Sequence, residues 1–154
     1  MIYVDTREKK WDHIKAYFDK HGVEYEMRKL DVGDYMLSGQ NRLTIDRKQN
    51  MQEMYQCLVA DRGRFGREVM RAYQHGQKLI VLIEHGGNIH SIDDVSSWKP
   101  KYGTVPSSEI AKRMVRLHIA FGVEFFFCSK RSTGSRITDI LNNSATFLQN
   151  GGTK

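Results

Sequence analysis

Two acidic residues and a lysine with the chemistry of a catalytic site stand in one stretch, GDYMLSGQNRLTIDRK, at residues 33–48. Asp34 lies near its start, and Asp46 and Lys48 lie at its end. If the second half of the stretch is a strand, the side chains of Asp46 and Lys48 share one face and that of Arg47 points to the other. An ammonium group beside a carboxylate can position or deprotonate a water molecule, or stabilise charge on a phosphate oxygen.

A third acid, Asp5, ends a predicted first strand, and carboxylates at neighbouring strand ends can converge at one edge of a sheet. Close carboxylates repel unless a cation neutralises them, and oxygen-only ligands favour a hard ion such as Mg²⁺ or Mn²⁺. We therefore predict a metal site formed by Asp5, Asp34 and Asp46. Spacing alone leaves other interpretations open, because Asp46 and Lys48 can form a solvent-facing strand pair and Asp34 can be an ordinary turn residue.

Hydrophobic periodicity predicts the elements that must position these residues. The expected strands are Ile2–Asp5, Tyr35–Leu37, Arg42–Lys48, Lys78–Glu84 and Val123–Cys128, with a further strand in VEYEMRKL and a hairpin turn at residues 38–41. The expected helices are residues 11–18, ended by Gly22, residues 51–75, interrupted near Gly63, a helix capped by Ser107 or Ser108 that runs to Phe121, and residues 134–148. This order predicts the α/β class, with helices on both faces of a central mixed β-sheet.

Composition places the chain among single-domain intracellular proteins. Its 154 residues are 40% hydrophobic, enough for one core. The two cysteines match no metal-ligand or redox spacing, which is typical of a reducing compartment. The sequence contains no apolar run of about 18 residues and no secretory leader, so we expect a soluble protein of the cytoplasm, nucleus or nucleoid.

The charge of the chain favours a polyanionic partner. The formal net charge is +6, and the excess cations gather in three segments, at residues 61–72, 99–116 and 130–136. One such cluster can be a solvated helix face, but three together favour nucleic acid. Trp98 and Tyr102 bracket two of the lysines and are candidates for base stacking. The residues that we expect to contact DNA are Arg7, Arg64, Arg67, Arg71, Lys99, Lys101, Lys130 and Arg131.

Several motifs in order resemble the nuclease domain of the XPF/Hef family of structure-specific endonucleases, a branch of the PD-(D/E)XK nucleases. They are VDTREKK, LDVGDYML, LTIDRKQNMQEM, GRF, KLIVLIE and EFFFCSKRSTGSRI. The resemblance implies a restriction-endonuclease-like three-layer sandwich and adds Glu8 to the catalytic candidates, which are then Asp5, Glu8, Asp34, Asp46 and Lys48. It also matches Arg47 and Arg64 to family arginines. Two positions depart from the family pattern: Asp46 replaces a glutamate, and Gln52, followed by Glu53, stands where an aspartate is expected.

The resemblance implies a Mg²⁺- or Mn²⁺-dependent DNA endonuclease of DNA repair or recombination, acting on branched or flap DNA. Residues 1–150 then form one nuclease domain, a homodimer through that domain is expected, and this chain has no room for the helix-hairpin-helix or helicase modules of many relatives. The alternative is a catalytically silent module for nucleic-acid binding or dimerisation. Retention of the acids and of Lys48 favours activity. A restriction-type nuclease would share the site chemistry but would need a base-reading element.

Overall fold

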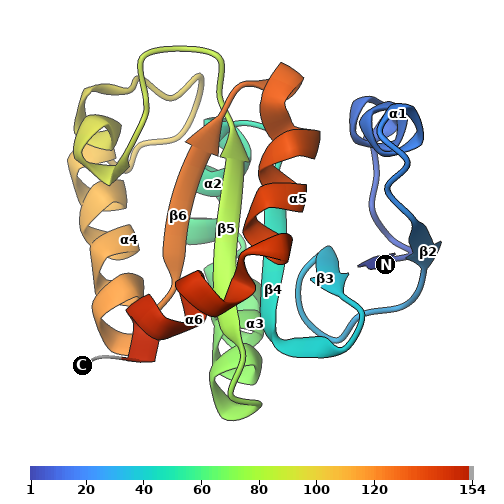
Figure 1. Cartoon of the computed structure of the whole chain (residues 1–154). Helices are drawn as coiled ribbons and strands as arrows, with labels where there is room; N and C mark the ends of the chain where they lie inside the picture. The colour runs from blue at the N-terminus through green and yellow to red at the C-terminus, as the bar shows by residue number, and fades with distance from the viewer. Residues whose placement is uncertain (153–154) are drawn as a thin grey trace.

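A six-stranded mixed sheet forms the centre of the computed structural model, which describes residues 1–152 (Figure 1). The strand order is β2-β1-β3-β4-β5-β6. The strands are β1 (Ile2–Val4), β2 (Tyr25–Met27), β3 (Tyr35–Leu37), β4 (Gln40–Lys48), β5 (Lys78–Glu84) and β6 (Glu124–Cys128). Strands β4, β5 and β6 are parallel, β3 is antiparallel to both β1 and β4, and β1 is parallel to β2. We call the edge where β4, β5 and β6 end the carboxyl edge.

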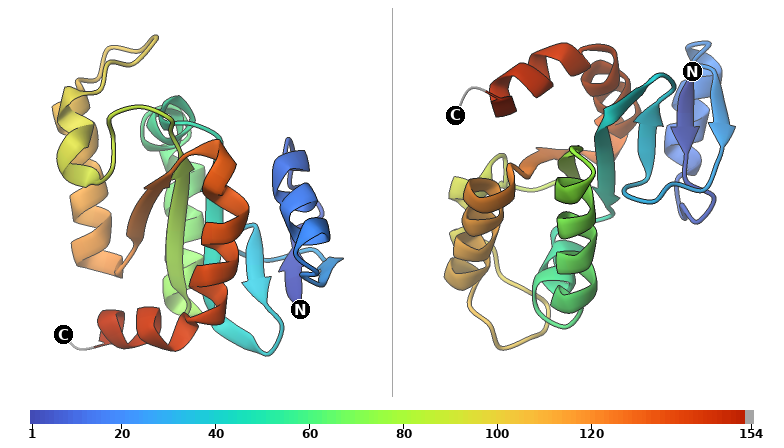
Figure 2. Two further views of the ribbon diagram at one scale, coloured as in Figure 1. Left: turned by 45° about the horizontal axis from the view of Figure 1, so that its top comes forward. Right: turned by 90° about the horizontal axis from the view of Figure 1, so that it is seen from below.

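Helices cover both faces of this sheet, as the two further views show (Figure 2). The helices are α1 (Asp12–Lys20), α2 (Met51–Leu58), α3 (Arg62–Gln74), α4 (Ser107–Phe121), α5 (Thr133–Asn142) and α6 (Ser144–Gly152), with short 3₁₀ turns η1 (Ile92–Ser97) and η2 (Lys130–Ser132). One core packs α1, α5 and α6 against the sheet, and the other packs α2, α3 and α4 against its opposite face. The prediction of an α/β three-layer sandwich with a mixed sheet is confirmed.

The alternation of side chains along β4 and β5 explains why these two strands lie at the centre. In β5, Leu79 and Val81 pack into the core with α2 and α3, whereas Ile80 packs into the core with α5. A strand that is apolar on both faces can only lie between two helical layers. In β4, Leu43 and Ile45 belong to the α5 core. The other face of β4 is therefore free to present polar side chains at its carboxyl end.

Two predicted helices are each divided in the structure. The first breaks between α2 and α3 at residues 59–61, ahead of Gly63, where Asp61 N–H donates to the carbonyl of Gln56 and ends the helix. The second breaks at Asn143, whose backbone and side-chain N–H groups both donate to the carbonyl of Asp139. The first break lies close to the interruption predicted near Gly63. The second was not predicted, because the apolar periodicity continues across Asn143.

The predicted serine cap of α4 is wrong. Pro106 occupies the N-cap position, and no side chain caps the helix. Ser107 instead donates its hydroxyl to the carbonyl of Trp98, which fastens the preceding loop to the start of the helix.

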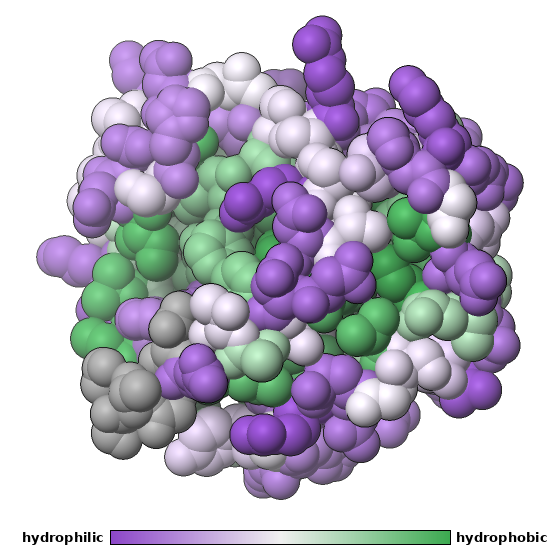
Figure 3. Space-filling view, in the orientation of Figure 1, coloured by the Kyte–Doolittle hydropathy of each residue, from purple (hydrophilic) through white to green (hydrophobic). Residues whose placement is uncertain are grey.

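The surface of the molecule is mostly hydrophilic on the face seen in Figure 3, where apolar side chains show in several patches, one of them over β6. Phe126 and Phe127 of this strand are half-buried. Within the described residues, no helix has the length and apolar character needed to cross a membrane.

Candidate active site

A cavity of about 480 Å³ opens at the carboxyl edge, between the end of β4, the start of α3 and the segment after β1. All the residues predicted to be catalytic line it: Asp5, Glu8, Asp34, Asp46 and Lys48. The predicted DNA contacts Arg7, Arg64, Arg67 and Arg71 line it too. Of the other expected contacts, Lys99 and Lys101 line a second cavity, whereas Lys130 and Arg131 are exposed in η2 outside both cavities.

The turn before β3 points Asp34 into the cavity. Gly33 has a φ of 77°, a conformation that side-chain-bearing residues rarely adopt, and a Cβ here would clash with Thr44 Oγ1. The Thr44 hydroxyl donates to the carbonyl of Val32 at 2.9 Å and so fixes the turn from below. Asp34 Oδ2 accepts the backbone N–H of Arg47 at 2.8 Å. The acid is therefore held by the backbone of the strand that carries the other site residues.

Asp34 and Asp46 form a close carboxylate pair. Burial raises the pKa of Asp34 well above its usual range, and the negative charges of Asp46 and Glu8 and a hydrogen bond to Asp46 raise it further. Asp34 is therefore protonated more readily than an ordinary aspartate, although the residue itself is only half-buried. Two carboxylates this close cannot both ionise freely without a cation.

Lys48 supplies the cation on the strand. Its Nζ lies 3.0 Å from Asp46 Oδ2, and its side chain is 10% exposed. The contact brings the charges together at an angle that makes no hydrogen bond, so Asp46 Oδ2 is buried with no donor directed at it among the described residues. Burial alone would lower the pKa of Lys48, but Asp46 and the Cys57 thiol outweigh it and the pKa is raised. Lys48 stays an ammonium group at neutral pH, and the predicted shared face of Asp46 and Lys48 is confirmed.

Glu68 of α3 is a site acid that the sequence interpretation missed. Its Oε2 accepts the N–H of Gly33 at 3.2 Å, and it lines the cavity. Burial and the charge of Asp46 raise its pKa. Helical spacing does predict its position, because a helix from Arg64 places Glu68 on the same face as Arg64 and Arg71. The prediction from this segment rested on its cations alone.

Asp5 lies in the cavity wall, and its carboxylate is already bonded. It accepts from Arg7 Nε at 2.9 Å, Arg7 Nη2 at 3.1 Å and the N–H of Leu30 at 2.8 Å. Burial would raise the pKa of Asp5, but these donors outweigh burial and lower it. A metal ion could bind Asp5 only by displacing Arg7, so its predicted role as a ligand needs a rearrangement that Asp34 and Asp46 do not.

Arg47 points away from Lys48 and into a buried ionic network. Its Nε donates to Glu8 at 2.9 Å and its Nη1 to Glu84 at 2.7 Å, with side-chain exposures of 1% for Arg47, 7% for Glu8 and 4% for Glu84. Its Nη2 donates to the carbonyl of Lys9 at 2.6 Å. One guanidinium thus joins β4, the end of β5 and the segment between β1 and α1.

Glu84 extends this network to two helices. Its second oxygen contacts His13 of α1 and accepts the hydroxyl of Thr133 at the start of α5. The Glu8 carboxylate is engaged with Arg47, so Glu8 contributes to the cavity mainly through its charge near Asp34. The network fixes the geometry of the strand end on which Asp46 and Lys48 stand.

Gln52, which departs from the family pattern after β4, and the neighbouring Glu53 both have structural partners. Gln52 faces away from Asp46: its Oε1 accepts the N–H of Lys101 at 2.8 Å and its Nε2 donates to the carbonyl of Tyr102 at 3.3 Å. Glu53 accepts the N–H of Gln49 at 2.6 Å, and its own N–H donates to Asn50 Oδ1. This reciprocal pattern caps α2. Gln52 is thus bonded to the loop before α4, whereas Glu53 also lines the first cavity.

The acids of the cavity fit a divalent cation. No three His, Cys, Asp or Glu side chains among the described residues are arranged as a ready-made ligand set. Mg²⁺, however, commonly binds through one or two carboxylates together with waters and substrate phosphates. Asp34 and Asp46 supply such a pair, with one buried oxygen that lacks a directed donor. Burial raises the pKa values of Asp34 and Glu68, and the charge of Asp46 raises both further; a cation would neutralise that charge.

Residues 4–140 match the ERCC4 domain. The chain belongs to the ERCC4 domain family. This is a family of DNA endonucleases, and the match confirms the resemblance to XPF-type nucleases that the motifs predicted. No curated protein sequence matches the chain.

Solved structures similar to this ERCC4 domain include XPF from Aeropyrum pernix, with a TM-score of 0.71 and 18% identity over 97% of this chain and 69% of that one. A second is the same protein in complex with DNA, with a TM-score of 0.69 and 18% identity over 94% of this chain. The chain spans 64% of the length of that second chain. At this identity the likeness concerns the fold of the ERCC4 domain.

Loss of the Arg47 guanidinium should strongly lower the free energy of unfolding of the ERCC4 domain. Arg47→Ala leaves Glu8 and Glu84 buried without their cation, which typically costs about 3–5 kcal/mol. Urea unfolding measures the change, with Arg42→Ala, an exposed arginine of the same strand, as the matched control. Arg42→Ala should change the free energy of unfolding by about 0.5 kcal/mol or less. Equal effects of the two substitutions would show that the network adds little to stability.

Removing one charge of the carboxylate pair should stabilise the metal-free ERCC4 domain. Asn can still accept from Arg47 N–H and can donate to Asp46, so we expect Asp34→Asn to raise Tm at pH 7 by about 3 °C, or about 1 kcal/mol in a chain of this size. Because the pKa of Asp34 is raised in the folded state, the parent loses stability as pH rises from the ordinary aspartate pKa through the folded-state pKa of Asp34. Asp34→Asn has no such loss. The difference in Tm should therefore vanish near pH 4. Thermal melts in EDTA test this, with the exposed Asp19→Asn as control, and an Asp34→Asn variant less stable than its parent at pH 7 would contradict it.

Proposed function

We propose that the chain is an active, metal-dependent DNA endonuclease that hydrolyses phosphodiester bonds. The observation that carries this proposal is the Asp34–Asp46 carboxylate pair with the Lys48 ammonium beside it, in a cavity rimmed by arginines. In a silent binding module we would not expect such an arrangement, because close buried acids destabilise the fold and repel DNA. In an active site the same acids are retained because catalysis requires them, although they lower stability.

The expected metal is Mg²⁺ or Mn²⁺, held by Asp34 and Asp46. When bound, such an ion polarises a phosphoryl oxygen and lowers the pKa of bound water. Glu68 supports the site from α3 by holding the N–H of Gly33, and its charge adds to the attraction for a cation. Asp5 holds Arg7 at the cavity wall, where the guanidinium faces an incoming phosphate.

The cationic residues have two different roles, charge stabilisation at the scissile phosphate and binding of neighbouring phosphates. Lys48 is protonated and buried beside Asp46, so it stabilises negative charge that develops on the scissile phosphate rather than removing a proton from water. Arg64, Arg67 and Arg71 are exposed on one face of α3 and line the cavity, where they can bind neighbouring phosphates. Chemistry and DNA binding are thus carried by different elements, β4 and α3.

Branched or flap DNA is the proposed substrate, in keeping with the family to which the chain belongs and with the DNA complex of a structural relative. A DNA substrate implies an intracellular site of action. We also propose a homodimer, because Val115 and Ile119 of α4 are apolar and exposed, with Ile119 at 77%. The two side chains lie one turn apart on the helix, so a second copy that packs there would bury both.

Cleavage should depend steeply on Lys48 and Asp46. Lys48→Ala removes charge stabilisation at the phosphate and should lower the single-turnover rate roughly 10²–10⁴-fold. Asp46→Asn should abolish cleavage by removing a ligand charge. Fork DNA binding, measured by fluorescence anisotropy, should stay within a few-fold of the parent for both variants, because the arginines of α3 are untouched.

The control for these variants is Lys78→Ala, which removes another half-buried lysine, paired with Glu124, outside the cavity. It should cleave at the parental rate if it is folded. A folded Lys48→Ala that cleaves within a few-fold of the parent would show that Lys48 is not catalytic, whereas a parent that binds forks and cleaves none would move the assignment to the silent binding module.

A further inference from the structure

A second cavity, of about 520 Å³, adjoins the candidate active site. It lies between the start of α2 and the loop that precedes α4, and it shares Gln49 and Glu53 with the first cavity. Gln49 directly follows Lys48 in the chain. The residue that follows Lys48 therefore lines the second cavity as well, so a strand of DNA whose phosphate lies at Lys48 would pass close to that cavity.

The loop that walls this cavity is held in place by side chains at three points. Gln52 of α2 bonds both the N–H of Lys101 and the carbonyl of Tyr102. The Tyr55 hydroxyl donates to the carbonyl of Val105 and accepts its N–H. Ser107, as described above, holds Trp98. A polar loop fastened in this way is a preformed wall, which lowers the entropic cost of binding a ligand against it.

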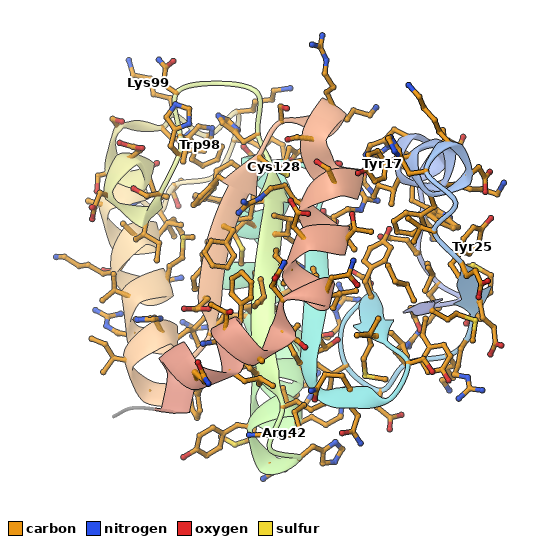
Figure 4. All side chains as sticks on the ribbon, in the orientation of Figure 1. Tyr17, Tyr25, Arg42, Trp98, Lys99 and Cys128 are labelled. Carbon is orange, nitrogen blue, oxygen red and sulfur yellow. The ribbon has the colours of Figure 1, made fainter. Side chains whose placement is uncertain are left out.

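The side chains on this wall have the chemistry of a single-stranded nucleic-acid site. Lys99 and Lys101 are exposed, and Tyr102 is 56% exposed. Trp98 is half-buried with its ring against Tyr55, and it lies beside Lys99 in the loop near the ends of β5 and β6 (Figure 4). The facing wall from α2 offers amide groups. Proteins bind unpaired strands with aromatic rings, on which the bases stack, and with cations beside them, which contact the phosphate backbone.

The charges around the cavity agree with this assignment. Glu53 is the one acid among the residues that line it, and its Oε1 is bonded to the N–H of Gln49. Two lysines oppose it. His85 also lines the cavity, and burial lowers its pKa, so it is neutral near pH 7 and can donate or accept a hydrogen bond.

We propose that this second cavity binds the first unpaired nucleotides of a single-stranded DNA arm, next to the phosphate that is cut. The proposal rests on the proposed function and names the feature of the substrate that the chain recognises. A base stacked inside a duplex cannot reach Tyr102, whereas an unpaired base can leave the stack and lie against an aromatic side chain. A preference for junctions follows: duplex phosphates contact the arginines of α3 and the unpaired arm enters the second cavity.

Binding without cleavage tests the subsite directly. Fluorescence anisotropy in EDTA compares a fork with oligothymidine arms, a single-stranded oligothymidine and a blunt duplex. Tyr102→Ala should weaken fork and single-strand binding about tenfold and leave duplex binding within about twofold. The matched control is Tyr73→Ala, a tyrosine with the same 56% exposure on α3 outside both cavities. It should bind all three DNAs like the parent.

The salt dependence of binding and the fluorescence of a modified base test whether the single-stranded arm lies in the second cavity. Lys99→Ala/Lys101→Ala should lower the salt-dependence slope for single-stranded DNA by about 1.4, at about 0.7 per phosphate. The control pair Lys15→Ala/Lys20→Ala, two exposed lysines of α1 outside both cavities, should not lower it. A 2-aminopurine placed one to three nucleotides from the junction should be quenched by the parent and not by Tyr102→Ala. Because the Tyr102 side chain is exposed and only its carbonyl bonds Gln52, the variant keeps the loop contacts.

The outcomes separate this proposal from the proposed function. If the parent cleaves forks and Tyr102→Ala binds them like the parent, or loses fork and duplex binding equally, the subsite is overturned and the nuclease assignment stands. If the parent cleaves no DNA but Tyr102→Ala selectively loses the fork and the 2-aminopurine signal, the subsite stands and the nuclease assignment fails.

Discussion

The buried guanidinium of Arg47 is the interaction on which the rest of the site depends. It joins Glu8, Glu84 and the backbone after β1, and through Glu84 it reaches α1 and α5. A buried ion pair adds little net stability compared with an apolar core, but it fixes one arrangement of the groups that it joins. Here that arrangement sets the end of β4, where the side chains on one face stabilise the fold and those on the other form the candidate active site.

The candidate site places charges where they are costly without a substrate. Asp34, Asp46 and Glu68 lie close together with Lys48 as the nearest buried cation, and burial and mutual repulsion raise the pKa values of Asp34 and Glu68. Such groups are typical of a functional site. The arginines of α3 and the lysines of the loop before α4 stay exposed at the rim. The acids are thus suited to hold a cation and the rim to hold DNA.

Much of this could be predicted from the sequence because short-range patterns determine it. Alternation in β4 correctly placed Lys48 beside Asp46 and Arg47 on the opposite face, and the apolar run of β5 predicted a strand covered on both sides. The break at Asn143, the α4 cap and the role of Gln52 could not be predicted in the same way. Gln52 depends on a partner far along the chain, the loop carbonyl of Tyr102, which periodicity does not specify. Helical spacing does place Glu68 beside Arg64 and Arg71, but it does not specify the bond of Glu68 to the N–H of Gly33.

We propose that this ERCC4 domain is an active, metal-dependent nuclease on branched DNA. The most direct measurement incubates the protein with single-stranded, duplex, flap and fork DNAs, in EDTA and with Mg²⁺ or Mn²⁺, and maps the products on a sequencing gel. We expect cuts close to the junction of flap and fork DNA with metal, slower cutting of plain duplex, and none in EDTA. Forks that are bound but left intact in both metals would contradict it.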